Sequence, residues 1–359
     1  MSGDFLDEEQ SFHDRDKKKF RKERRHAQET DRSKFKKTDQ KEVKKEFDPN
    51  LPRGRVLAIT GEGIWIDDGV NRRLCILKGL LKKEKLQAKN LIAVGDFVRY
   101  WEHSILHVEE RFSSLARQDI SGRKEQLIAV NIDQVLIIAS LTEPPLKPAL
   151  VDRYIIAARK GNMHPILIVN KIDLLSKASE QEKELFHAFV AAYEPLGLPI
   201  LSVSTTSGVG IEALRCLMKG KSSVFSGQSG VGKSSLINVA FGLTLKTGDL
   251  AQKTFKGTHT TTTAEFLTLP GGGYCIDTPG VRSFGIWGLE KRDVTSHFTE
   301  ITELAYGCKF PDCAHIEEPH CAVLQALEEK KLSPLRYESY KSLLAEARGD
   351  IDNWTRDKL

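Results

Sequence analysis

After residue 130, short continuous apolar runs alternate with longer segments in which apolar residues recur at helical spacing. This pattern predicts strands over 133–140, 165–169, 200–203 and 222–225, and helices over 149–159, 179–196, 211–218 and 233–241. Unbroken apolar strands between amphipathic helices are typical of a parallel sheet with helices on both faces. Beyond residue 290 the chain is polar and helical, interrupted by a cluster of cysteines.

A different rhythm covers residues 51–117, where short apolar segments are separated by turns rich in glycine and aspartate. Five strands are predicted, over 56–59, 64–66, 74–77, 97–101 and 105–108. Strands of this kind favour a small barrel of the oligonucleotide-binding (OB) type. The segment carries twelve Lys or Arg against eight Asp or Glu. Trp65, Tyr100 and Trp101 are candidates to stack on bases, although aromatic residues in a small barrel commonly belong to its core.

The first 50 residues differ again in composition. Residues 15–45 hold fifteen Lys or Arg against six Asp or Glu, with few apolar side chains among them. Such a segment cannot bury enough apolar surface to offset its chain entropy, so we predict a disordered basic arm. The arm either contacts a polyanion through its charges or is a solvated tail without a target.

Neither a secretory signal nor a membrane span is expected. The first ten residues hold four acidic side chains and no apolar signal core, and the longest apolar runs fall far short of the ~18 residues that a span needs. Three of the six cysteines lie between residues 308 and 321, which indicates metal ligands in a reducing compartment rather than a disulfide framework. We therefore expect a cytoplasmic protein of several domains with no membrane partner.

A phosphate-binding motif follows the strand predicted over 222–225. The segment fits G-x-x-x-x-G-K-[ST] and comprises Gly227, Gln228, Ser229, Gly230, Val231, Gly232, Lys233, Ser234 and Ser235. The glycines let backbone N–H groups surround a phosphate chain, and the N-terminus of the next helix adds positive potential. Lys233 is expected to reach the β- and γ-phosphates, and Ser234 to ligate Mg²⁺.

A second motif predicts which base is bound. Asn170, Lys171, Ile172 and Asp173 follow the strand predicted over 165–169, at the sheet edge where such folds bind ligands. A carboxylate at Asp173 accepts hydrogen bonds from the ring N–H and the exocyclic amine of guanine, a pair that adenine lacks. Ser204 and Thr205, at the end of the next strand, are expected to complete the base pocket. The expected nucleotide is therefore GTP.

Two further polar segments are candidates for sensing the γ-phosphate. Asp277 follows a short strand over 274–276, where its carboxylate is expected to hold Mg²⁺ through water, and Gly280 offers a backbone N–H. Earlier in the chain lies a run of threonines over 260–263, one of which is expected to close onto Mg²⁺ and the γ-phosphate. Such a loop is ordered by the triphosphate and released on hydrolysis.

The order of these motifs is unusual for a GTPase. In most GTPases the phosphate loop comes first, but here Asn170 and Ser204 precede Gly227, and Asp277 comes last. Cyclic order is kept, so a permuted chain can assemble the same site. With a barrel before the GTPase core and a cysteine cluster after it, the sequence resembles the bacterial small-ribosomal-subunit-dependent GTPases, a circularly permuted family. The resemblance covers residues 51–359 and leaves out the basic arm.

The cysteine cluster agrees with this resemblance. Three thiolates and one imidazole make a closed tetrahedral set suited to structural Zn²⁺, supplied by Cys308, Cys313, His315 and Cys321. Buried free cysteines are the alternative interpretation. His320 is adjacent to Cys321, but the family pattern implies His315 as the ligand. The expected domains are the arm (1–50), a five-stranded OB-type barrel (51–117), a circularly permuted α/β P-loop GTPase (118–288) and a mostly helical zinc-binding domain (289–359).

The resemblance also implies a catalytic residue and partners. Many GTPases orient the attacking water with a glutamine after the aspartate motif; here Val281 follows Gly280 and cannot do so. The family pattern implies His259 instead, although a contact of His259 with ribosomal RNA is the alternative. The implied partners are the 30S subunit and its 16S rRNA. The implied role is GTP hydrolysis stimulated by that subunit, assisting its late maturation, and we expect a monomer.

Two other functions compete with this interpretation. One is an RNA-binding sensor in which turnover resets binding and guanosine tetraphosphate occupies the same pocket. The other is an ATP-dependent kinase or transporter ATPase, which the guanine motif at 170–173 disfavours. Because the segment after Asp277 continues directly into residues 290–359, we also expect its movement to be transmitted to them.

Overall fold

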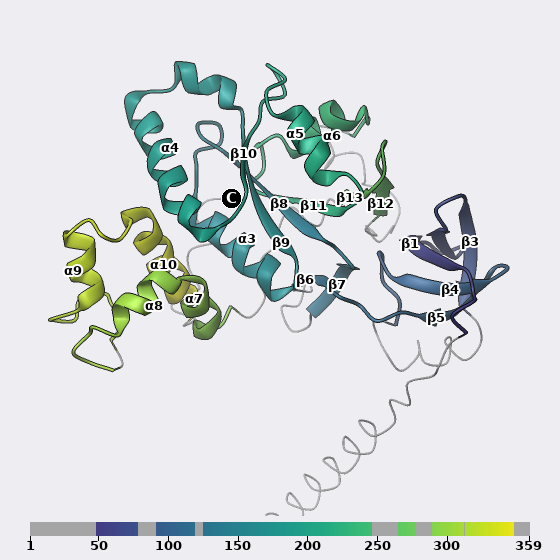
Figure 1. Cartoon of the computed structure of the whole chain (residues 1–359), viewed down its shortest axis with the longest axis horizontal. Helices are drawn as coiled ribbons and strands as arrows, with labels where there is room; N and C mark the ends of the chain where they lie inside the picture. Colours follow the sequence, from purple (N-terminus) through teal and green to yellow (C-terminus); the bar gives the residue numbers. More distant parts are fainter. Residues whose placement is uncertain are drawn as a thin grey trace, which may run out of the picture. The chain divides into compact units, whose positions relative to one another are not determined.

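The computed structural model describes residues 48–77, 91–118, 125–245, 265–277, 289–311 and 313–347 (Figure 1). The chain divides into two units, Met1–Asn50 and Leu51–Leu359, and the account below concerns the second. Nearly all of the predicted basic arm lies outside the described residues. No helix in the described ranges is both long and apolar enough to cross a membrane.

The first strands close into the predicted five-stranded barrel. In the order β1-β2-β3-β5-β4 they are β1 (Arg53–Ile59), β2 (Ile64–Asp67), β3 (Arg72–Leu77), β5 (Ser104–Val108) and β4 (Phe97–Trp101). Tyr100 is only 5% exposed and belongs to the barrel core. Trp65 is partly buried and packs against the core of the next domain, whereas Trp101 is 59% exposed. Trp101 is therefore the most exposed of these three residues.

A six-stranded sheet forms the centre of the second domain. Its order is β10-β9-β8-β11-β13-β12, with bounds β10 (Ile200–Ser202), β9 (His164–Asn170), β8 (Gln134–Ser140), β11 (Ser222–Ser226), β13 (Tyr274–Asp277) and β12 (Glu265–Thr268). Five strands are parallel, as predicted, but β12 pairs antiparallel with β13. The sequence pattern missed β12 because its four residues begin with Glu265 and end with Thr268, leaving no continuous apolar run. A separate two-stranded sheet, β6 (Ser114–Gln118) with β7 (Glu125–Val130), was also not predicted.

Helices cover both faces of this sheet, as the apolar pattern predicted (Figure 1). Val135 and Ile137 of β8 pack with α3 (Pro148–Lys160) and α4 (Glu180–Tyr193). Leu136 and Ile138 face the other way, toward α5 (Ile211–Met218) and α6 (Lys233–Phe241). Two short 3₁₀ helices complete the layer, η1 (Ile172–Lys177) and η2 (Glu194–Leu196). The predicted helix over 179–196 is α4 followed by η2, since Pro195 has no N–H with which to continue the α-helical ladder.

The C-terminal part is helical and has a core of its own. It comprises α7 (Lys291–His297), α8 (Thr299–Ala305), α9 (Ala322–Glu328) and α10 (Pro334–Ala347). Phe298, Tyr337, Tyr340 and Leu343 are among its buried side chains. The cysteine cluster lies between α8 and α9 and at the start of α9.

A fully buried carboxylate joins these C-terminal helices to the GTPase core. Asp152 of α3 is 0% exposed, and its Oδ1 accepts a hydrogen bond from Arg336 of α10. His297 Nε2 of α7 lies 2.9 Å from the same oxygen, and the Tyr193 hydroxyl of α4 donates to Oδ2 at 2.6 Å. Burial lowers the pKa of His297, so its ring is neutral near pH 7 and Arg336 is the counter-charge in this cluster.

Replacing Asp152 with Asn should strongly destabilise the protein. The change removes the fully buried counter-charge of the Arg336 guanidinium and leaves only the partly exposed Glu300 as its partner; breaking a buried ion pair typically costs about 3–5 kcal/mol. Lys160→Met is the matched control, because Lys160 forms an exposed ion pair with Asp293 between the same helices, α3 and α7, and such pairs contribute at most about 1 kcal/mol. Free energies of unfolding from denaturant titration would compare the two. Equal losses would contradict this account of the interface.

Candidate nucleotide site and metal centre

The predicted nucleotide motifs meet at one edge of the central sheet. Strands β9, β10 and β11 run parallel, so their carboxyl ends lie at the same edge. Asn170 ends β9, Ser204 lies two residues beyond β10, and Gly227 follows β11 directly. Residues that are far apart in the sequence are thereby gathered where doubly wound sheets bind their ligands.

The phosphate loop between β11 and α6 is shaped by two glycines. Gly227 has φ of 137°, and a Cβ there would lie 2.2 Å from the carbonyl oxygen of Ile138. Gly232, with φ of 91°, precedes the first residue of α6. The ammonium of Lys233 donates to the carbonyl oxygens of Gly227 and Gln228, each at 2.7 Å. A cation and the N-terminus of α6 thus both lie at the loop, the arrangement that binds phosphate groups.

The side chain of Asn170 ties the guanine motif to this loop. Its Nδ2 donates to the carbonyl oxygen of Val231 at 2.8 Å, and a Cβ on Gly232 would lie 2.5 Å from the same nitrogen. Among the described residues, the buried Oδ1 of this amide has no hydrogen-bond partner. An unsatisfied buried acceptor calls for a partner that the protein itself does not supply, which fits a ligand site.

Asp173, in η1, is oriented by a residue of the loop that follows β10. The Ser204 hydroxyl donates to Asp173 Oδ1 at 2.5 Å and accepts from the backbone N–H groups of Thr206 and Ser207, at 3.2 and 3.1 Å. Lys171 adopts a left-handed conformation, with φ of 61°, and its ammonium donates to the Glu143 carbonyl. These contacts fix one carboxylate oxygen of Asp173. Thr205, also predicted for this pocket, is half-buried.

The remaining predicted site residues lie wholly or partly outside the described residues. The backbone of Asp277 ends β13 at the same sheet edge, but its side chain is not described. His259, the threonines at 260–263 and Gly280 all fall outside the described residues.

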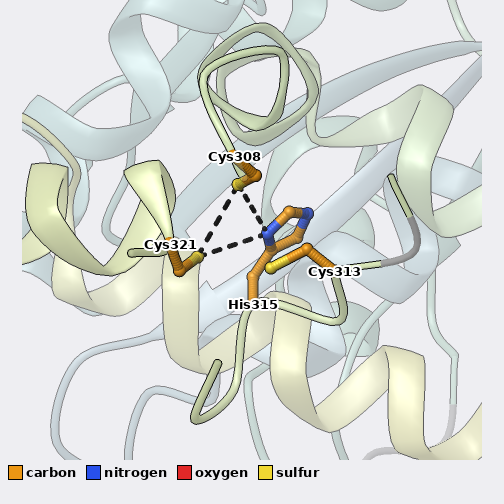
Figure 2. Close-up of side chains that lie close together, drawn as sticks. All are labelled: Cys308, Cys313, His315 and Cys321. Atoms are coloured by element: carbon orange, nitrogen blue, oxygen red, sulfur yellow. Dashed lines mark hydrogen bonds between the residues drawn. The ribbon is translucent and has the colours of Figure 1, made fainter. Parts of the chain in front are cut away.

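The four predicted metal ligands converge in the C-terminal part, as Figure 2 shows. All ligand atoms lie within 4.8 Å of one another. The Nδ1 of His315 is 3.5 Å from the sulfurs of both Cys308 and Cys321, and these two sulfurs are 3.8 Å apart. Cys313 completes the group beside the ring of His315 (Figure 2). His320, the neighbour of Cys321, is exposed and does not belong to this group.

This spacing fits a zinc ion. Zn²⁺ bound tetrahedrally at about 2.3 Å from sulfur and about 2.0 Å from nitrogen separates two sulfurs by about 3.8 Å, and sulfur from nitrogen by about 3.5 Å. Desolvation and the neighbouring thiols raise the pKa of Cys313 to about 12, so this thiol is protonated near neutral pH unless a metal binds. The donor set is closed and has no further position for a substrate, which is typical of a structural site.

Known proteins resemble this chain in sequence and in fold. The family model described as RsgA GTPase matches residues 108–287. A Chlorobaculum parvum protein named small ribosomal subunit biogenesis GTPase RsgA is 41% identical over 306 residues, which cover 81% of this chain and 96% of the relative. The chain belongs to the RsgA GTPase family. A relative of the same name from Flavobacterium psychrophilum is 38% identical and is covered over 88% of its length.

Two solved structures match the fold of this chain. YjeQ from Thermotoga maritima matches with a TM-score of 0.65 and 30% identity, covering 83% of this chain and 99% of YjeQ. YloQ, described as a circularly permuted GTPase, matches with a TM-score of 0.62 and 25% identity over 85% of this chain. The permuted GTPase fold and the GTP hydrolase activity predicted from the sequence are therefore confirmed.

One residue that the sequence analysis missed organises the loop that carries the candidate metal ligands. The Glu318 carboxylate accepts hydrogen bonds from the backbone N–H groups of Ala314, Ile316 and Glu317, at 2.7, 2.8 and 3.1 Å. These bonds hold the pKa of Glu318 low, at about 2. His315 lies within the turn that they fix, with φ of 60°. No spacing rule marks such a glutamate, because its partners are backbone groups.

Gly232→Ala should abolish tight nucleotide binding by this RsgA chain while leaving it folded. The added methyl group meets Asn170 Nδ2 at 2.5 Å and occupies a backbone conformation that alanine disfavours, so the loop must shift away from the guanine motif. We expect at least a tenfold loss of affinity for a fluorescent GDP analogue. Gly242→Ala, at the other end of α6, is the control, because it has φ of 65° but open space around it. Equal affinity of both variants for the GDP analogue would contradict this role of Gly232.

Glu318→Gln should weaken zinc retention. Glutamine has one acceptor oxygen in place of two, so the loop loses at least one of its N–H bonds and its carboxylate charge. Loss of supporting contacts around metal ligands costs about 10–100-fold in metal affinity, and we expect faster zinc release to a chromogenic chelator. Glu317→Gln, an exposed neighbour, should release zinc at the wild-type rate. Equal release from both variants would contradict the role of Glu318.

Proposed function

We propose that this chain is a cytoplasmic, monomeric GTPase that binds the 30S ribosomal subunit, hydrolyses GTP under stimulation by that subunit and assists its late maturation. Two kinds of finding support the proposal. The sheet edge joins a guanine motif to a phosphate loop through the Asn170–Val231 hydrogen bond. Relatives at 38–41% identity are named for biogenesis of the small ribosomal subunit.

Within this proposal, each nucleotide motif has a distinct task. The segment from Gly227 to Ser235 holds the phosphates through its backbone N–H groups and Lys233. The segment from Asn170 to Asp173, with Ser204 and Thr205, holds the base. The 2.8 Å contact of Asn170 with the phosphate loop supports the joint action of the two segments, since it fixes the distance between base and phosphate subsites.

Selectivity for guanine is assigned to Asp173. Its Oδ1 is held by the Ser204 hydroxyl, so the carboxylate cannot rotate freely toward another partner. A fixed carboxylate accepts the two adjacent N–H groups of guanine and is left unpaired by adenine, which makes binding of ATP unfavourable. The same feature disfavours the ATP-dependent kinase and transporter ATPase alternatives.

For hydrolysis, the proposal assigns Mg²⁺ to Ser234 and Asp277 and the handling of water to His259. A bound Mg²⁺ neutralises developing charge on the phosphate oxygens. Lys233 supplies a second positive charge from the start of α6. Gly280 offers a backbone N–H toward the γ-phosphate, and His259 accepts a proton or orients water near neutral pH.

The remaining domains are assigned to the ribosomal partner. We take residues 51–117 as the barrel, 118–288 as the GTPase and 289–359 as the zinc domain, with Zn²⁺ held by Cys308, Cys313, His315 and Cys321. The exposed ring of Trp101 supports contact of the barrel with 16S rRNA, because an exposed aromatic face is what a single-stranded base stacks on. Zinc bound by these four residues would hold the loop between α8 and α9 in one conformation, which we also assign to contact with 16S rRNA.

Steady-state GTP hydrolysis with and without purified 30S subunits tests the proposal. We expect at least a tenfold stimulation that is specific to 30S and absent with 50S subunits, because activating partners of GTPases complete the transition-state contacts. ATP should neither compete with GTP nor be hydrolysed. His259→Ala should retain GTP binding and lose the stimulation. Binding to 30S without faster turnover would instead favour the RNA-binding sensor.

A further inference from the structure

Strands β12 and β13 form a hairpin between two segments that the proposed function places at the γ-phosphate. Glu265 of β12 pairs with Asp277 of β13, and the strands are antiparallel along their whole length. The threonine run ends at residue 263, two residues before β12, and Asp277 is the last residue of β13. Any displacement of this hairpin therefore moves the backbone at Asp277.

The barrel contacts this hairpin through side chains of three strands. Arg72 of β3 donates from Nη2 to the Thr268 hydroxyl at 2.9 Å, and the Tyr274 hydroxyl donates to Asp67 of β2 at 3.2 Å. From β1, the guanidinium of Arg55 lies over the rings of Phe266 and Tyr274, at 4.6 and 4.7 Å from their centroids. The barrel thus contacts both strands of the hairpin, β12 and β13.

Arg55 is an unusual buried cation. It is 7% exposed, and its guanidinium donates hydrogen bonds to neutral oxygens, from Nη1 to the Ser222 hydroxyl and from Nη2 to the Asn131 carbonyl, each at 2.5 Å. Its Nε has no hydrogen-bond partner within the described ranges. The nearby carboxylate of Asp133 accepts from the backbone N–H of Ser222 rather than from Arg55. Burial lowers the pKa of Arg55 to about 10, which leaves it protonated at pH 7.

Ring faces therefore supply much of what stabilises this charge. Besides Phe266 and Tyr274, the ring of Phe97 in β4 lies 5.0 Å from the guanidinium carbon. A desolvated cation is attracted to the face of a well-placed ring, and this attraction falls as the ring moves away. Because two of the three rings belong to the hairpin, moving the hairpin withdraws stabilisation from a charge that cannot reach water. The energy of Arg55 is thus coupled to the position of the hairpin.

We propose that Arg55 is a positioning residue for GTP turnover, through which the barrel holds the β12–β13 hairpin and thereby sets the backbone at Asp277. The proposal rests on the proposed role of Asp277 at Mg²⁺. It makes the barrel part of the machinery for hydrolysis, in addition to a binding module. A partner that contacts the barrel would then act on the γ-phosphate site through the hairpin.

The test compares Arg55→Met with Arg53→Met in the full chain, without ribosomes. Methionine keeps the length and packing of the side chain and removes its charge. Arg53 is the matched control, because it lies on the same strand, pairs with Glu109 and lies 3.8 Å over Phe97, and none of these partners belongs to the hairpin. For Arg55→Met we expect kcat for GTP to fall about tenfold with KM within about twofold of wild type. Arg53→Met should match wild type in both.

Hydrogen exchange separates positioning from general destabilisation. In the wild-type protein, peptides from 53–77 and from 265–277 should both change protection when GDP is replaced by a non-hydrolysable GTP analogue. In Arg55→Met the change in 53–77 should disappear, while strands β9 and β11 keep wild-type protection. A wild-type kcat in Arg55→Met would overturn the proposal. So would equal protection of peptides 53–77 in the GDP and GTP-analogue states of the wild-type protein.

A milder variant covers the case in which Arg55→Met does not fold. Thr268→Val keeps the branched shape of an exposed strand residue and removes only the acceptor for Arg72. It should lower kcat about two- to threefold at unchanged KM and unchanged midpoint of unfolding, and a wild-type kcat would count against the proposal. Because none of these assays contains ribosomes, a missing response to 30S would refute the proposed function without affecting them.

Discussion

The side-chain amide of Asn170 joins two segments that lie 61 residues apart in the chain, by donating to the Val231 carbonyl inside the phosphate loop. The approach is so close that only glycine fits at position 232. Parallel pairing of β9 with β8, and of β8 with β11, brings the two strand ends to this distance. The nucleotide site therefore depends on the order of strands in the sheet and not on the order of motifs in the sequence, which is why a permuted chain can build it.

The GTPase core is attached to its two neighbours by buried ions of opposite sign. On one side, Asp152 receives hydrogen bonds from Arg336, His297 and Tyr193, which tie α3 to α10, α7 and α4. On the other, Arg55 lies among aromatic rings and neutral oxygens. Hydrogen bonds to a carboxylate demand fixed directions, whereas the attraction of a cation to a ring face changes gradually with displacement. The two attachments therefore differ in how much movement they allow.

Sequence spacing was enough to predict a site wherever its residues lie close together in the chain. The phosphate loop, the guanine motif and the cysteine cluster are each recognisable within about fifteen residues because a ligand or metal dictates which groups must be close. The structure brings the residues of each of these three motifs close together. Spacing failed where tertiary contacts decide: β12 is too short and polar at its ends to show as a strand, and Trp65, Tyr100 and Trp101 differ only in what packs against them. Glu318, Asp152 and Arg55 carry no pattern at all, since their partners come from other elements or from the backbone.

This difference in attachment bears on how a nucleotide signal leaves the GTPase core. The expectation from the sequence was that the segment after Asp277 moves the zinc domain, because the chain continues directly into it. Yet α7 and α10 are bonded through Asp152 to α3, whose N-terminal half lines the same small apolar cavity as Gly227 and Gln228 of the phosphate loop. A unit held by directional hydrogen bonds to that helix moves with it as one body or not at all. The barrel contacts the hairpin through the hydrogen bonds of Arg72 and Tyr274 and through Arg55, whose attraction to the rings changes gradually with ring position. A small displacement is therefore opposed less steeply at the ring contacts of Arg55 than at the hydrogen bonds of Asp152.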